Sequence, residues 1–346
     1  MAPTDARYHS IEMSCHSGFV AILGAPNPGK STLLNALVGE KVAIVSEWPQ
    51  TTRNRILGIV NRPGAQIAVM DTPGLHHPDS LLGRQMLGEI EEALDGIEVL
   101  LVIVDATKRF GRPEQQVFER AERFPGARIL LLNKIDRIRK DRLLPLIQEY
   151  SKKLEFAEII PISALTGDGV ELLARTLEKH LPEGPPLFPE DQYTDQPERF
   201  LAAEILREKV LQHTRREVPH AVAVVLDRFE EGDKLTRILA TIYVDREGQK
   251  GIVIGRGGAM LKTIGTEARQ ELEAMLGRKV FLDLFVKVRP DWRDQAAVVR
   301  ELDWRRQLEQ REDVEEVEEV KEIAEVEEAE EPEEPEEPEE PEETEE

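Results

Sequence analysis

Five short apolar runs recur in the first half of the chain, and amphipathic stretches separate them. Continuous apolar runs are typical of strands buried on both faces, whereas a strand with one wet face alternates. The pattern predicts a mostly parallel sheet with helices on both faces, an α/β domain at residues 17–181. The runs are FVAIL at 19–23, IAVM at 67–70, VLLVIV at 99–104, RILLL at 128–132 and EIIPI at 158–162.

A sixth run, at 55–60, lies close enough in sequence to IAVM to favour an edge hairpin. The amphipathic stretches predict helices in the segments between the runs. These helices are expected near 30–39, 80–95, 113–124, 140–154 and 168–180.

A linker with five prolines at 182–198 ends this pattern, because proline continues neither a helix nor an interior strand. The sequence pattern of the region that follows, residues 199–311, predicts an α+β domain. It is expected to contain a helix from Arg199 to about Arg216, alternating strands at 220–229 and 235–245, a short apolar turn, the loop GRGG at 255–258, an amphipathic helix and a strand at 279–288. Residues 1–16 are expected to be flexible.

The charge of the chain is concentrated at its end. The formal net charge is −23, but residues 312–346 hold 21 Glu, one Asp and one Lys, which leaves −2 on the rest. Charge repulsion and repeated proline predict a disordered tail there. The acidic overall composition therefore says little about the partners of the folded regions.

The sequence excludes a protein with a membrane-spanning helix and a protein stabilised by intramolecular disulfides. The longest apolar run, 99–104, is far shorter than the about 18 residues of a membrane span. A single cysteine, Cys15, cannot form an intramolecular disulfide, which fits a reducing cytoplasm.

The segment GAPNPGKS, at 24–31, directly follows the first predicted strand and opens a helix. That is the context of a phosphate-binding loop, in which backbone N–H groups and a helix N-terminus surround phosphates. Lys30 would neutralise the β- and γ-phosphate oxygens, and the Ser31 hydroxyl would ligate Mg²⁺.

Three further motifs follow later strands. In DTPG at 71–74, Asp71 can hold the Mg²⁺ shell and the Gly74 N–H can meet a γ-phosphate. In NKID at 133–136, the Asp136 carboxylate can accept the two N–H groups of guanine, which adenine does not offer. In SAL at 163–165, the Ala164 N–H can meet guanine O6. Each motif alone is weak, but four in this order at strand ends predict a GTP site.

The motifs GAPNPGKSTLLNAL, PQTTRNRILGI at 49–59, DTPGLH, NKID and SAL resemble the Era family of bacterial GTPases. The segments FPEDQYTDQPERFLAAEILREKV and GQKGIVIGRGGAMLKTIGTEAR resemble its linker and its type II KH domain, so the likeness covers about 17–305. The resemblance implies a P-loop GTPase domain, then a KH domain. It also implies a GTP-hydrolysing, Mg²⁺-dependent enzyme that binds the 3′ end of 16S rRNA and assists assembly of the small ribosomal subunit from its pre-30S precursor.

The resemblance also assigns roles to single residues. Thr52, or as the alternative Thr51, would complete the Mg²⁺ shell with Ser31 and Asp71, and Asn27 would help to hold a K⁺ ion. For catalysis it implies Lys30, Thr52 and Gly74. For nucleotide binding it implies Gly24, Ala25, Pro26, Asn27, Pro28, Gly29, Lys30, Ser31, Thr32, Asp71, Thr72, Pro73, Gly74, Asn133, Lys134, Asp136, Ser163, Ala164 and Leu165.

At two positions near the nucleotide site the sequence departs from the residues of related GTPases. Leu75 stands where Ras-like enzymes have a glutamine that orients water, so slow intrinsic hydrolysis is expected. His76 and His77 are not expected to act as bases, because positioning and charge dominate phosphoryl transfer. Pro28 stands where the family has a residue whose N–H points at the β-phosphate, and proline cannot donate.

The GRGG loop, by its flanking elements, predicts a contact with single-stranded RNA. Glycines allow the backbone to approach nucleotides closely, and apolar positions beside the loop can receive bases. Residues 251–290 carry seven Lys and Arg against four Asp and Glu, a local net charge of +3. The RNA-binding set is Ile254, Gly255, Arg256, Gly257, Gly258 and Lys262.

Three functions compete. The first is a monomeric cytoplasmic GTPase switch that binds rRNA and not DNA; the second is a constitutive RNA-binding protein with a structural nucleotide site. The third is a GTPase peripheral to the inner face of the cell membrane, which neither a lipidation signal nor a strongly basic helix supports. RNA affinity that depends on the bound nucleotide separates the first from the second.

Two interpretations of the tail stay open. It is a solubilising appendage, or it is a polyanion that competes with RNA for the basic groove of the KH domain. A flexible chain of these 35 residues spans about 30 Å, so it can reach such a groove.

Removal of residues 312–346 distinguishes the two interpretations of the tail. A competing tail predicts that truncation strengthens the binding of a scrambled RNA more than that of the cognate RNA, chiefly at low salt, where charge is least screened. Equal affinities of the truncated and full chains at low salt support the appendage. The measurement is a binding titration of both RNAs across a salt series.

Overall fold

The structure is a computed structural model that describes residues 15–75 and 78–305. The expectations for residues 1–14 and for the tail at 312–346 lie outside the described residues. The N-terminal region (residues 16–181) and the C-terminal region (residues 198–302) each contain one sheet. No helix among the described residues is long and apolar enough to cross a membrane.

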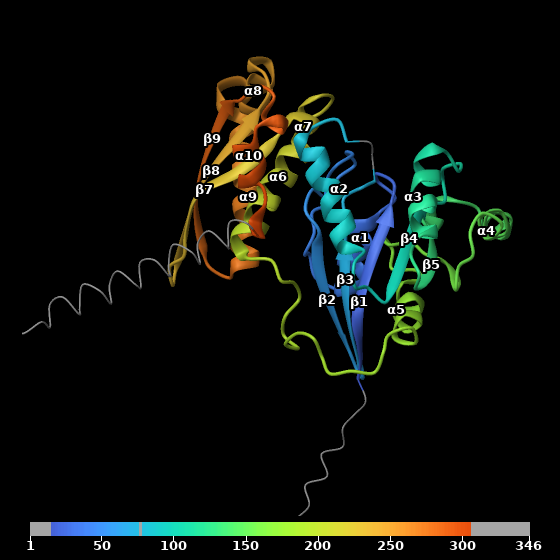
Figure 1. The fold of residues 1–346 in the computed structure, drawn as a ribbon. Coiled ribbons are helices and arrows are strands. Elements are labelled where there is room, and N and C mark those ends of the chain that lie inside the picture. Colours follow the sequence, from blue (N-terminus) through green and yellow to red (C-terminus); the bar gives the residue numbers. More distant parts are fainter. Residues whose placement is uncertain (1–14, 76–77, 306–346) are drawn as a thin grey trace, which may run out of the picture. The chain divides into compact units, whose positions relative to one another are not determined.

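The sheet of the N-terminal region has the strand order β2-β3-β1-β4-β5-β6 (Figure 1). All neighbouring strands are parallel except β2 and β3, which form the expected antiparallel edge hairpin. One expectation is wrong: His16, placed in the flexible N-terminus, opens β1. The strands are β1 His16–Gly24, β2 Ile56–Arg62, β3 Ala65–Asp71, β4 Val99–Asp105, β5 Ala127–Asn133 and β6 Glu158–Pro161.

Helices cover this sheet on both sides, and the apolar runs explain why. Alternate residues of β1 belong to different cores: Val20 and Ile22 to one, Ala21 and Leu23 to the other. Because every residue of a doubly covered strand meets a hydrophobic layer, the strands read as continuous apolar runs. The helices are α1 Lys30–Val38, α2 Leu81–Ala93, α3 Arg112–Glu122, α4 Leu143–Ser151 and α5 Val170–Glu178.

The C-terminal region is an α+β unit whose sheet has the order β7-β8-β9, with β7 antiparallel and β9 parallel to β8 (Figure 1). Val253, Ile264 and Ile238 belong to its core, which joins the helices to one face of the sheet. Its elements are α6 Glu198–His213, α7 Val218–Ala221, β7 Ala223–Glu230, β8 Leu235–Val244, α8 Glu247–Ile254, α9 Ala259–Leu276, β9 Lys279–Val288 and α10 Ala296–Glu301.

Two details of the C-terminal region differ from expectation. The segment expected to be an apolar turn before GRGG is the helix α8, in which Val253 is fully buried. Packing of that residue outweighs the low helix propensity of the glycines in the segment. The short helix α7 precedes β7, where strand was expected from residue 220. The order α6-β7-β8-α8-α9-β9 is the expected order of the type II KH fold.

Candidate functional site

The loop between β1 and α1 is built for a close approach to phosphate. Asn27 and Gly29 have φ angles of 63° and 104°, in the left-handed region. A Cβ on Gly29 would lie 2.3 Å from the Asn133 side-chain nitrogen, so glycine is required there for space as well as for conformation. A small pocket of about 50 Å³ opens at this loop. Its lining includes Pro26, Asn27, Pro28, Gly29, Lys30, Ser31, Thr32, Thr52 and Gly74.

Lys30 is 6% exposed, and its ammonium donates to the Ala25 carbonyl at 3.2 Å. Burial lowers the pKa of Lys30 to about 8, although the nearby Asp71 carboxylate opposes that shift. A buried ammonium with so little compensation is stabilised by an anion in contact with it. A phosphate group is such an anion.

Three oxygens from separate segments meet beside Lys30. The Ser31 hydroxyl donates to Asp71 Oδ2 at 2.6 Å and lies 2.9 Å from the Thr52 hydroxyl, which itself donates to Asp71 at 3.1 Å. Asp71 Oδ1 is buried and has no hydrogen-bond partner among the described residues. Desolvation raises the pKa of Asp71, which the Lys30 charge counteracts. One carboxylate with two hydroxyls suits Mg²⁺, an ion that takes its other ligands from phosphate and water.

The structure distinguishes the two threonines of PQTTR. The Thr51 hydroxyl donates to the Trp48 carbonyl at 2.7 Å and lies 2.6 Å from the Ser46 hydroxyl, away from Asp71. Thr52 is therefore the threonine that the fold brings to Ser31 and Asp71.

A larger pocket of about 710 Å³ adjoins the phosphate loop and contains the groups expected to contact the base. Asp136 lines it, held by a 2.7 Å hydrogen bond from the Ser163 hydroxyl. Asn133 also lines this pocket, and its side chain donates to the Pro28 carbonyl at 2.7 Å and accepts from the Ala164 N–H at 2.9 Å. The Ala164 N–H, which we expected at guanine O6, thus serves to hold Asn133.

Lys134 adds a second link between NKID and the phosphate loop. Its ammonium donates to the Asn27 carbonyl at 2.9 Å and pairs with Asp105 at 2.7 Å. Sequence reasoning missed Asp105, Thr107 and Lys108, which line the same pocket. A signal was present, because Asp105 ends β4 and the other two follow it, at the edge where the parallel strands end, the usual place for ligands in such sheets.

Some expected nucleotide residues lie outside both pockets. The Thr72 side chain is fully buried and donates to the Ile22 carbonyl, so it joins β3 to β1 and does not reach the nucleotide site. Gly24, Ala25, Asp71, Pro73 and Ser163 line neither pocket, although the buried Asp71 carboxylate is reached by the Ser31 and Thr52 hydroxyls. His76 and His77 lie outside the described residues. Leu165 lines the base pocket, as does Asn27.

The GRGG loop joins α8 to α9 in the C-terminal region. Gly255, Gly257 and Gly258 all have positive φ angles, and a Cβ on Gly255 would come within 2.6 Å of the Met260 Cβ. These glycines are therefore required by the turn itself. Ile254 is the last residue of α8, and Arg256 lies in the turn between the glycines.

Beside the loop, α9 and β9 enclose a groove of about 500 Å³. Gly258 and Lys262, both expected in the RNA site, line it, together with Leu261, Gly265, Thr266, Arg269, Val280, Phe281, Leu282 and Leu284. Phe281 is 52% exposed, unusual for a large apolar side chain, and was not identified from the sequence. An exposed ring beside basic residues is suited to stacking with an unpaired base.

Asp136→Asn is expected to exchange guanine preference for xanthine preference, because the amide donates to the xanthine O2 whereas the carboxylate accepts from the guanine N–H groups. GTP and XTP affinities measure the exchange. Asp105→Asn is a matched control in the same pocket, expected to weaken both nucleotides without reversing their order. An Asp136→Asn protein that still prefers GTP removes this residue from the base site.

Pro28→Val is expected to tighten GDP binding, because it restores an N–H beside the β-phosphate. A hydrogen bond to a charged acceptor contributes about 1.5–3 kcal/mol, and ordering a loop that has lost the rigidity of proline offsets part of that gain. Calorimetric titration gives the affinity, and Pro28→Ala, which restores the same N–H with a smaller side chain, should behave alike. Equal or weaker binding by both variants would mean that the loop already satisfies the phosphate without this donor.

Comparisons with known proteins identify relatives of both regions. A family model described as "50S ribosome-binding GTPase" matches residues 19–134, and one described as "KH domain" matches residues 217–293. GTPase Era of Syntrophus aciditrophicus is 49% identical over 290 residues, which cover 83% of this chain and 95% of that protein. GTPase Era of Geobacter metallireducens is also 49% identical, over 83% of this chain and 97% of its own length.

Solved structures give the same result. A variant of Aquifex aeolicus Era bound to GDP and AlF4⁻ is 46% identical, with a TM-score of 0.79 over 83% of this chain and 98% of that one. Era in complex with MgGDPNP and nucleotides 1506–1542 of 16S ribosomal RNA is 46% identical, with a TM-score of 0.80 and the same coverage. Since both regions match in order and nearly the full length of these relatives is covered, the chain belongs to the Era family of GTP-hydrolysing enzymes.

Proposed function

We propose that this chain is a GTP-controlled switch that binds the 3′ end of 16S rRNA through the α9–β9 groove and assists assembly of the small ribosomal subunit. The observation that carries the proposal is the groove, which combines an exposed Phe281 with Lys262 and Arg269 beside a glycine loop. A relative that matches 83% of the chain was solved with that part of 16S rRNA. We assign the nucleotide to residues 17–181 and the RNA to residues 199–311.

In the nucleotide site, Ser31, Thr52 and Asp71 would hold Mg²⁺, and Lys30 would contact the phosphates. The ion supplies charge neutralisation at the β- and γ-phosphate oxygens. The chain would supply position, since Lys30, Thr52 and Gly74 line the same pocket. The relative with MgGDPNP supports this assignment.

We also propose a K⁺ ion at Asn27. The Asn27 side-chain nitrogen donates to the Glu47 carbonyl at 2.5 Å, so the amide oxygen is the end of the side chain suited to a cation. A monovalent cation there would add positive charge near the phosphates, where this chain has Leu75 and no glutamine at the corresponding place.

In the RNA groove, the proposed contacts divide into two kinds. Lys262 and Arg269 would neutralise phosphates, and the loop glycines would allow the backbone close to them. Leu261, Leu282 and Phe281 would receive the bases. We propose a monomer in the cytoplasm, where its rRNA partner resides.

The rival function is a constitutive RNA-binding protein whose nucleotide site only stabilises the fold. The shared contact between the two regions favours the switch. The described segment that carries Thr52 is hydrogen-bonded to the C-terminal region, so a change at the γ-phosphate has a direct route to the RNA-binding region.

Phe281→Ala is expected to weaken the binding of a 3′-end 16S oligonucleotide about 5- to 150-fold, because base–aromatic stacking contributes about 1–3 kcal/mol. Phe285→Ala is the matched control: Phe285 is 47% exposed on the same strand but does not line the groove. Fluorescence anisotropy gives the affinities.

The same titrations with GDP, with a non-hydrolysable GTP analogue and without nucleotide test the switch. We expect the affinity of the unmodified chain to depend on the nucleotide. Equal affinities in all three states would favour the constitutive RNA-binding protein, and equal losses in the two phenylalanine variants would place the RNA elsewhere.

A further inference from the structure

The segment that carries Thr52 has little structure of its own. Helix α1 ends at Val38 and β2 begins at Ile56, with neither helix nor strand between them. The N-terminal region holds the ends of this segment. The Asn35 side chain accepts from the Val42 and Ala43 N–H groups at 3.1 and 2.9 Å, and Glu89 accepts from the Arg55 N–H at 2.8 Å.

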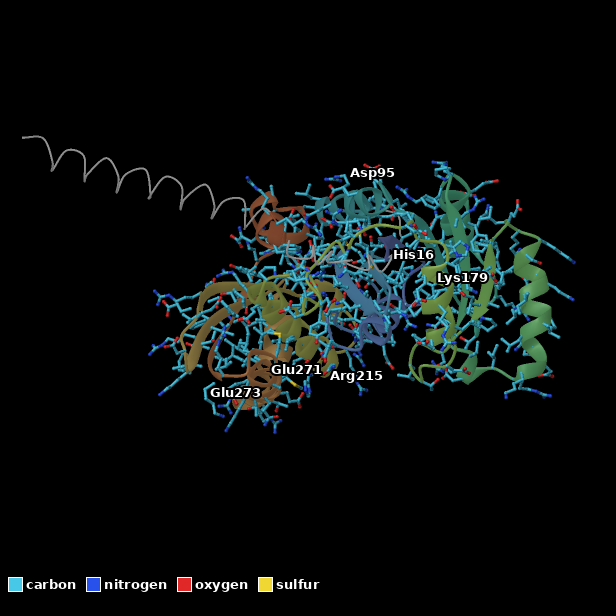
Figure 2. The ribbon with its side chains drawn as sticks, turned by 90° about the horizontal axis from the view of Figure 1, so that it is seen from below. His16, Asp95, Lys179, Arg215, Glu271 and Glu273 are labelled. Atoms are coloured by element: carbon cyan, nitrogen blue, oxygen red, sulfur yellow. The ribbon has the colours of Figure 1, made fainter. Side chains whose placement is uncertain are left out.

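The middle of the segment is held by α6 of the C-terminal region. Glu208 accepts from the Val45 N–H at 2.9 Å, and the Leu211 carbonyl accepts from the Trp48 indole N–H at 3.2 Å. Lys41 reinforces the contact, since its ammonium lies 2.5 Å from carboxylate oxygens of both Glu208 and Glu271, the latter on α9 and labelled in Figure 2.

The two residues that flank Thr52 are each tied to the C-terminal region. Arg207, on α6, donates to the Thr51 carbonyl. Arg53 donates to the Val222 carbonyl at 2.9 Å, and its guanidinium lies 5.2 Å from the centroid of the Trp292 ring. The backbone on both sides of Thr52 is thereby fixed from outside the nucleotide-binding region, while the Thr52 hydroxyl itself reaches Ser31 and Asp71.

The Arg207 guanidinium is held in place for its hydrogen bond to the Thr51 carbonyl. It is 2% exposed, and Glu204 on the same helix pairs with its guanidinium at 2.5 and 2.8 Å. The pair neutralises the buried charge and fixes the direction of the remaining donors. A planar guanidinium held in this way can keep a backbone carbonyl in one place.

We propose that Arg207 is a positioning residue for GTP hydrolysis, which acts by holding the Thr51 carbonyl and so keeps the Thr52 hydroxyl beside Ser31 and Asp71. It does not line the nucleotide pockets. The inference concerns hydrolysis by the free protein and does not depend on RNA binding. GDP affinity should not require Arg207, because the phosphate loop and the base pocket belong wholly to the N-terminal region.

Two variants test the proposal while guarding against misfolding. Arg207→Lys keeps a cation beside Glu204 but loses the planar fork; Arg207→Met combined with Glu204→Gln removes the pair without leaving a buried carboxylate unpaired. Arg199→Met is the matched control, because Arg199 lies on the same helix and also donates to a carbonyl, that of Leu226, within the C-terminal region.

The first measurement is amide hydrogen exchange of the protein without nucleotide or Mg²⁺. Faster exchange in peptides spanning 45–52 is expected in both Arg207 variants, with unchanged exchange in β1 and β4.

The second measurement is GTP hydrolysis without RNA. We expect kcat to fall about tenfold, which corresponds to the loss of one charge-assisted hydrogen bond. We also expect the Mg²⁺ concentration for the half-maximal rate to rise. The GDP affinity of each variant should stay within about twofold of that of the unmodified protein, a smaller change than the loss of a charge-assisted hydrogen bond would cause.

Unchanged exchange at 45–52 and unchanged kcat in either folded variant would overturn the proposal, as would equal losses in Arg199→Met. A thermal melt identifies any variant that has unfolded, in which case the other variant decides. RNA affinity plays no part in these readouts, so their failure leaves the proposed RNA function intact.

Discussion

Three oxygens within 3.1 Å of one another join three separate segments of the N-terminal region. Ser31 comes from the helix after the phosphate loop, Asp71 from the end of β3, and Thr52 from a segment without secondary structure. The Asp71 carboxylate is fully buried, and its Oδ1 has no hydrogen-bond partner among the described residues, so its charge is incompletely compensated even with Lys30 nearby. The proposed Mg²⁺ would supply positive charge at this carboxylate.

The position of Thr52 links this need to the other region of the chain. The hydrogen bonds from Arg207 and Arg53 lie on either side of it. Burial of the Arg53 guanidinium costs desolvation free energy, because its Nε and one Nη have no hydrogen-bond partners in the described part of the chain. The same burial lowers the pKa of Arg53 to about 9. The Arg207 charge adds to that shift. Glu204 acts on the Arg53 charge only at a distance, so a contact that buries this cation without a direct ion pair stabilises weakly.

Much of the fold could be predicted from the sequence because parallel strands covered on both faces have a distinct signature. The continuous runs at β1, β3, β4 and β5 coincide with strands that are largely buried, β3 and β4 at every residue, and the motifs at their ends meet at one edge. Helix α8 could not be predicted in this way, because its glycines favour a turn and only packing of Val253 shows otherwise. Phe281 was missed because alternation in β9 predicts an exposed face but not which exposed ring borders a groove. Arg207 was missed because its importance depends on a contact with a residue 156 positions away.

The two ends of the Asn133 side chain are both engaged, one with the phosphate loop and the other with the last loop of the site. Gly29 leaves only just enough room for it. Base recognition and phosphate binding are consequently not separate modules here. Substitutions on either side of this amide should be energetically coupled rather than additive, as is usual for residues that share a partner. Any evolutionary path toward another base must therefore preserve the loop that holds the phosphates, which restricts the order in which its steps can occur.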